Sequence, residues 1–408
     1  MAKKQPKAVN GPSGDYRFEV MVCRDGRWTI DGVMSDEAGA RSRAQALVNS
    51  RACQEVKVTR QLLRGGQESF SSEILHLKVK DKGSKTFALS GDPAKAPICK
   101  GVEDFYRWET RRFIASLLRG YLQHHAIIPS ELLFNWRHAK ALLESGSLPY
   151  DAARRVAAAQ AERQGEPSEP RMKALEGMLE AAAKRSADLQ AAGRAFLNGK
   201  SLQGDNLPPL KGVSGREART LAAACISDQL ASVGHLEGKI DMLLELLPDA
   251  GQGWFATIEE MLAECLLSGE SLTILFPQIV DHISLILALA DLVEGRDTAP
   301  AIRRAPKLAA LAKMIGLGSA PHCQSVLEAW MVPIIRGREP LDRNNPAKEV
   351  QLIDQLGRRI RRSDGSWIGG EAVAKAVELR KARTREKTLR GLGMDTAADA
   401  LGRAAVRG

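Results

Sequence analysis

The feature that most constrains this chain is a block of apolar helical patterns over residues 214–293. Apolar side chains recur there every three or four positions over 236–247 and again over 257–269, as they do when one helix face is buried. Residues 279–293 are apolar on almost every side. The block therefore predicts a large all-α body, with the helix at 279–293 as its buried centre.

Length and composition limit the class of protein. A chain of 408 residues exceeds what one hydrophobic core usually serves, so two or three domains are expected. No segment has the roughly 18 to 20 apolar residues of a membrane span, which predicts no membrane insertion. The N-terminus has lysines but no apolar stretch behind them, so it is not a secretory signal, and a cytoplasmic location is expected.

The six cysteines form no C-x-x-C pair. This spacing argues against a zinc ribbon and against a disulfide framework, and it predicts reduced, buried thiols.

Alternating apolar and polar residues predict a small β-rich module over residues 15–92. A helix is expected from 36 to 49, between the second and third strands. If those two strands are parallel, the helix forms a right-handed crossover. The expected strands lie at 18–22, 28–34, 56–62 and 75–79.

A single helix can cover only one face of that sheet. We expect Met21, Cys23 and Val33 on the uncovered face, opposite Phe18 and Ile30. The uncovered face is therefore not wholly polar, which leaves two interpretations: an interaction surface, or ordinary scattered apolar surface.

Beyond residue 104 the pattern becomes helical, so the fold class is α+β, with a small ββαβ(β) domain, a large helical body and a basic helical tail. We expect a long helix at 105–122, a second helix capped by Ser130 and running to 143, and a protruding polar helix at 171–197. The predicted division is a disordered arm at 1–14, the α+β domain at 15–92, a helical hairpin and Ala-rich helices at 104–197, a linker at 198–213, a central bundle at 214–335 and a basic helical region at 336–408.

The formal net charge of +10 is concentrated at the two ends of the chain. Residues 1–110 carry 19 Lys and Arg against 14 Asp and Glu, residues 111–334 carry 23 against 25, and residues 335–408 carry 17 against 10. Such asymmetry is typical of proteins that bind an acidic partner, nucleic acid or anionic lipid. It is equally typical of solubilising charge on exposed helices.

The basic residues near the C-terminus are the main candidates for a binding site, because a helix with a basic face presents the spaced positive charge that phosphates require. No aromatic residue interleaves with them for base stacking, and no helix-turn-helix pattern follows. The candidate anion-binding or nucleic-acid-binding residues are Arg358, Arg359, Arg361, Arg362, Arg380, Lys381, Arg383, Arg385, Lys387 and Arg390.

Signatures of familiar enzymes are missing: the sequence has no phosphate-binding loop, no dinucleotide fingerprint, no nucleophile elbow and no H-E-x-x-H motif. We therefore assign no catalytic residue and no cofactor.

Two histidine patterns leave alternatives open. His124, His125 and His138 with Glu131 are metal-compatible residue types, but adjacent histidines point about 100° apart on a helix. Ordinary histidines at helix ends explain them as well, so no metal site is assigned. His282 beside Asp281 fits either a catalytic pair or a core histidine satisfied by a hydrogen bond.

These observations favour a non-enzymatic, cytoplasmic regulatory or scaffold protein. Its partners are expected to be an unidentified protein and, through self-association, a second copy of the chain. The alternative is a nucleic-acid-binding protein that uses the basic C-terminal helices.

Overall fold

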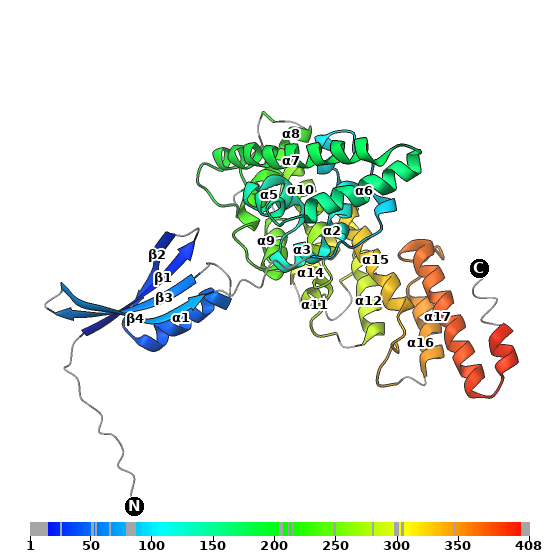
Figure 1. Cartoon of the computed structure of the whole chain (residues 1–408). Coiled ribbons are helices and arrows are strands. Elements are labelled where there is room, and N and C mark those ends of the chain that lie inside the picture. Colours follow the sequence, from blue (N-terminus) through cyan, green and yellow to red (C-terminus); the bar gives the residue numbers. More distant parts are fainter. Residues whose placement is uncertain are drawn as a thin grey trace, which may run out of the picture. The chain divides into compact units, whose positions relative to one another are not determined.

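The computed structural model describes residues 15–24, 27–49, 53, 55–64, 67–78, 87–203, 207–210, 212–213, 215–247, 250–279, 281–297, 302, 306–345 and 348–400. The predicted arm at 1–14 lies outside these residues. The chain divides into two compact units, Met1–Lys85 and Thr86–Gly408 (Figure 1). The α+β class with a large helical body is confirmed.

The N-terminal unit is a four-stranded antiparallel sheet with one helix, in the strand order β2-β1-β3-β4. Both β2 and β3 run antiparallel to β1, which lies between them, so they are parallel to each other. The helix α1 connects them across β1. The elements are β1 (Asp15–Arg24), β2 (Arg27–Met34), α1 (Glu37–Asn49), β3 (Glu55–Arg64) and β4 (Gln67–Lys78).

One face of this sheet packs against α1. Alternate residues of the two central strands point toward the helix, because side chains alternate between the faces of a strand. On the helix, Ala40, Ala44 and Leu47 recur at helical spacing and are buried. The buried strand residues are Phe18, Val20, Val22, Val56 and Val58.

A bulge in β2 changes which residues share the uncovered face. Met21 pairs with Ile30, whereas Val20 pairs with Gly32, so Asp31 is an extra residue. Ile30 therefore lies on the uncovered face beside Met21. The expectation that Ile30 shares the helix-covered face was wrong, because a strict alternation assumes an unbroken register.

The helical unit contains both helix-rich regions and the basic C-terminal region. Its described helices are η1 (Pro93–Lys95), η2 (Val102–Tyr106), α2 (Trp108–Leu117), α3 (Arg119–His125), α4 (Pro129–Phe134), α5 (Trp136–Leu143), α6 (Leu148–Gln164), α7 (Ser168–Leu197), α8 (Gly215–Leu230), α9 (Leu236–Leu246), α10 (Gln252–Leu266), α11 (Ser271–Leu275), α12 (His282–Val293), α14 (Pro306–Gly316), α15 (Pro321–Arg336), α16 (Glu349–Arg359) and α17 (Gly370–Gly391).

The centre of this unit is α10. It packs against α2, α4, α8, α9, α11 and α15, and its apolar face is fully buried at Ile258, Met261 and Leu262. The helix that we expected at the centre, α12, packs against α14, α15 and α16 and exposes Ser284. The prediction was wrong because it ranked the helices by their apolar side chains alone, whereas α10 also buries Glu259 and Glu264.

Two expected helices are each divided. Residues 105–122 include the end of η2, all of α2 and most of α3, and residues 130–143 form α4 and α5. Asn135 separates α4 from α5, and its side chain accepts the first-turn N–H of Arg137. Ser130 does not cap a helix as predicted, because α4 begins one residue earlier, at Pro129. The N–H of Ile128 before it is bound by the Glu131 carboxylate.

The helix predicted to protrude is packed. α7 contacts α4, α5, α6 and α8, and small residues such as Ala182 and Gly193 form its buried face. A Cβ atom at Gly193 would lie 3.0 Å from the backbone carbon of Ala224, so this close approach of α7 to α8 favours glycine. The prediction was wrong because small side chains resemble solvent-facing positions when only the sequence is read.

The described part of the predicted linker at 198–213 is anchored on the helical core. Leu202 is buried, and its N–H and carbonyl both bond the side chain of Gln229. The indole of Trp254 donates to the carbonyl of Pro208. The finer division of the helical unit into domains stays a prediction.

The C-terminal helices also pack on this unit: α17 contacts α15 and α16, and α16 contacts α12 (Figure 1). None of the described helices is long and apolar enough to cross a membrane. All six cysteines are free and buried, as predicted.

Candidate functional site

Arg380, one of the predicted binding residues, is buried and bonded within the chain. It is 6% exposed and donates to Glu349 at 2.8 Å. It also donates to the carbonyl oxygens of Ile335 and Gly337, at 3.0 and 3.2 Å. The forked guanidinium suits such a multiple contact, which ties α17 to the end of α15. Arg380 is therefore occupied within the chain, contrary to its predicted role.

Six more of the predicted cations have partners within the chain, and these contacts reduce the positive potential offered to a phosphate. Arg383 is one of them and donates to the carbonyl of Arg336 at 3.3 Å. Arg362 bonds Glu294, Lys381 pairs with Asp354, Arg390 pairs with Glu386 and Asp399, Arg361 lies over the ring of Trp367, and Arg358 donates to the carbonyl of Asp354.

Arg359, Arg383, Arg385 and Lys387 are exposed, and two of them line a groove. Arg383 and Lys387 lie four residues apart on α17 and, with Arg338, border an open groove of about 580 Å³. Arg338 and Lys387 form no ion pair with any residue that the structure describes. Glu349 also borders the groove, but Arg380 and the N–H of Leu341 occupy its oxygens. We call this the basic groove. Arg359 and Arg385 are exposed outside it.

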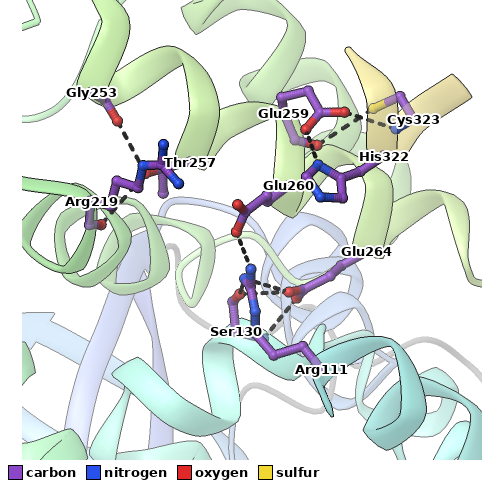
Figure 2. A network of polar contacts seen from close by, with 10 residues as sticks. All are labelled: Arg111, Ser130, Arg219, Gly253, Thr257, Glu259, Glu260, Glu264, His322 and Cys323. Carbon is purple, nitrogen blue, oxygen red and sulfur yellow. Dashed lines mark hydrogen bonds and ion pairs between the residues drawn. The ribbon is translucent and has the colours of Figure 1, made fainter. Parts of the chain in front are cut away.

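A buried charge network lies at the centre of the helical unit, where α10 meets α2 and α4 (Figure 2). The guanidinium of Arg111 donates to Glu264 and to the Ser130 hydroxyl, both at 2.7 Å, and it pairs with Glu260. The hydroxyl and the N–H of Ser130 both donate to Glu264, at 2.8 Å. Both oxygens of Glu264 therefore have donors, although burial raises the pKa of this carboxyl and Arg111 opposes the rise.

The same helix joins α15 through Glu259 (Figure 2). This carboxylate accepts the N–H of Cys323 at 2.8 Å and lies 2.7 Å from Nδ1 of His322. The hydrogen bond to Glu259 raises the pKa of His322, because it favours the charged imidazolium. The ring of His322 packs edge-on against Trp108 of α2. These contacts join three helices and leave neither oxygen of Glu259 without a partner.

A second buried ion pair explains part of the histidine pattern. The Lys239 ammonium lies 2.6 and 2.8 Å from the two oxygens of Glu131, and both side chains are almost fully buried. Burial raises the pKa of Glu131, and the charge of Lys239 opposes this rise. Nε2 of His138 lies 3.6 Å from the same carboxylate. Burial and the nearby Lys239 lower the pKa of His138 to about 4.

The four metal-compatible residues do not converge on one site, although His138 lies near Glu131. His124 and His125 lie against the ring of Phe87, with ring centroids 5.3 and 6.0 Å away. Glu131 already has the ammonium of Lys239 as its cation. Among the described residues, no three His, Cys, Asp or Glu side chains are placed to hold a metal ion.

Asp281 and His282 do not form a pair. The carboxylate of Asp281 accepts the N–H of Ser284 at 2.7 Å and caps α12. Nε2 of His282 lies 4.0 Å from Glu339. The alternative of a catalytic pair at this helix end has no support in this geometry.

The uncovered face of the N-terminal sheet presents apolar side chains. Ile30 and Val33 are 54% and 47% exposed. Beside them, Trp28 is held by the Lys57 ammonium, 4.5 Å from its ring centroid, and by the ring of His76. We call Met21, Trp28, Ile30 and Val33 the open sheet face.

Sequence reading missed Arg338 because it followed helical patterns, and Arg338 comes after the end of α15. It also missed the buried glutamates of α10. The available signal was the position of Glu264 within the apolar stripe that includes Met261 and Cys265. Comparison of this chain with models of protein families, with curated proteins and with solved structures finds no match.

Proposed function

We propose that this protein is a non-enzymatic binding protein, of the regulatory or scaffold class, whose N-terminal unit docks a protein partner through the open sheet face. The observation that supports this is the exposure of Ile30 and Val33 beside Trp28, whose ring contacts Lys57 and His76. Large apolar side chains grouped on one face favour association, because burying them removes apolar surface from water. A cytoplasmic site of action is part of the proposal.

The chemistry of the open sheet face defines the partner. Tryptophan is a frequent energetic centre of protein interfaces, and here Lys57 and Glu55 provide polar groups beside it. We propose a partner with an apolar patch and a polar rim. A second copy of this chain is the alternative occupant.

The test compares capture from nuclease-treated lysate by the intact protein and by the double variant Ile30→Asp, Val33→Asp. Each substitution buries a charge in the complex, so we expect at least a tenfold loss of affinity for the specific partner. The control with the same added charge is the double variant Ala38→Asp, Ala46→Asp, at exposed positions of α1. Identical capture by all three proteins would refute the docking face. Sedimentation of the same proteins shows whether the partner is a second copy.

The basic groove favours a second candidate function, the binding of nucleic acid. Arg338, Arg383 and Lys387 bring three exposed cations to one concave surface. Fluorescence anisotropy with single-stranded and duplex oligonucleotides tests it. Replacing all three with alanine should weaken binding on every sequence and reduce the salt slope by about two to three.

The matched control for this experiment is the triple variant Lys140→Ala, Lys184→Ala, Lys200→Ala, which removes the same charge from exposed positions elsewhere on the helical unit. Equal binding and salt dependence of the two triple variants would show that only net charge matters and would exclude the groove.

A further inference from the structure

The helical unit contains an apolar cavity of about 130 Å³ where η2, α2, α4, α5, α6 and α7 meet. No charged side chain lines it, and its polar lining side chains are Thr110 and Cys99. It shares no lining residue with the basic groove. The docking and phosphate-binding functions above do not use it.

Alanines create this space. Adjacent pairs on two helices, Ala152 with Ala153 on α6 and Ala182 with Ala183 on α7, border the cavity. Larger apolar side chains border the cavity elsewhere on the same two helices, at Val156 and Leu175. The empty volume therefore lies where the sequence places methyl groups at core positions, and a leucine at such a position would occupy it.

The cavity is unsuited to water. The Thr110 hydroxyl and the Cys99 thiol lie 3.9 Å apart, and the thiol donates to the carbonyl of Pro97 at 3.8 Å. A buried water needs two to four polar partners, and these two groups already have partners. Burial also raises the pKa of Cys99, so its thiol is neutral. A charged ligand would have no counter-charge here.

We propose that this cavity is the binding site of a small, uncharged, hydrophobic molecule, with the size of a benzene ring or a short alkyl chain. A dry cavity of roughly 150 Å³ lined by aliphatic and aromatic side chains binds benzene or xenon, and this cavity has nearly that volume. Residues that line the cavity are spread from Ala96 to Ala183, so binding of the ligand stabilises the folded helical unit.

The test uses the full chain with benzene and xenon as probes and benzoate as the charged counterpart of benzene. At about ten times its dissociation constant, benzene should raise the unfolding temperature by roughly 2 °C or more, and benzoate should not. The variant Ala153→Leu fills the cavity and should abolish the shift. Its control, Ala158→Leu, adds the same side chain at an exposed position of α6 and should preserve the shift.

A second measurement needs no variant. With selectively labelled isoleucine methyl groups, benzene should shift the resonance of Ile114, which lines the cavity, and leave that of Ile353 on α16 unchanged. Xenon should show a bound resonance that benzene displaces. The proposal is overturned if Ile114 does not respond, or if benzene stabilises Ala153→Leu as much as the wild type.

Discussion

The buried pair of Lys239 and Glu131 allows a quantitative prediction. Lys239 is 1% exposed and Glu131 is 0% exposed. In Lys239→Met the carboxylate loses its ammonium partner and keeps the N–H of Ile128, at 3.0 Å. Breaking one side of a buried pair typically costs about 3–5 kcal/mol, because an uncompensated charge stays in the core.

Protonation of Glu131 limits the destabilisation caused by Lys239→Met. At pH 7 the solution is about 2.7 units above the ordinary glutamate pKa of about 4.3, and each unit corresponds to about 1.36 kcal/mol. Protonating Glu131 therefore limits the destabilisation to about 3.7 kcal/mol at pH 7 and to about 1 kcal/mol at pH 5. The cost of Lys239→Met should fall as the pH falls.

The assay is urea unfolding followed by circular dichroism at 222 nm, a signal that comes mainly from the helical unit. The control is the double variant Glu131→Gln, Lys239→Met, which removes both charges and should regain most of the lost stability. A pH-independent cost, or a double variant no more stable than Lys239→Met, would show that the destabilisation does not come from an unpaired buried carboxylate.

Three further predictions use the same unfolding assay. The pKa of His138 is about 4 in the folded chain and about 6.5 when unfolded, so the unfolded state binds more protons as the pH falls. About 3 kcal/mol of the free energy of unfolding should therefore be lost from pH 7 to pH 4. His138→Gln should flatten this pH dependence, and an unchanged pH profile of the variant would contradict the prediction. Arg380→Lys should lower the free energy of unfolding by about 2–4 kcal/mol, because an ammonium cannot replace the several hydrogen bonds of the guanidinium. A variant as stable as the wild type would show that Arg380 behaves as an ordinary surface cation. Gly193→Val should lower the free energy of unfolding by about 1–3 kcal/mol, because the larger side chain pushes α7 away from α8. Wild-type stability of this variant would show that the two helices can move apart at little cost.

The N-terminal unit was largely predictable because its signals are local. Alternation located the strands, and α1 has three buried residues at helical spacing. The position of Ile30 was not predictable, because a one-residue bulge at Asp31 depends on how two strands pair.

The centre of the helical unit was misplaced for a different reason. Hydrophobic patterns assign glutamates to solvent, but Glu264 is buried because Arg111 lies 153 residues away in sequence and next to it in space. The same non-local pairing decides the basic tail. Arg380 and Arg383 look alike in sequence, yet only Arg380 meets Glu349.

We propose that this protein acts through the open sheet face rather than through its C-terminal charge. The most direct test is one capture experiment from nuclease-treated and untreated lysate, comparing the intact chain, the Ile30→Asp, Val33→Asp variant and the Arg338→Ala, Arg383→Ala, Lys387→Ala variant. We expect the capture of a protein partner to survive nuclease treatment and to be lost only from the sheet variant. Capture that disappears with nuclease, and is lost only from the groove variant, would rule out the open sheet face and would identify the protein as a nucleic-acid binder.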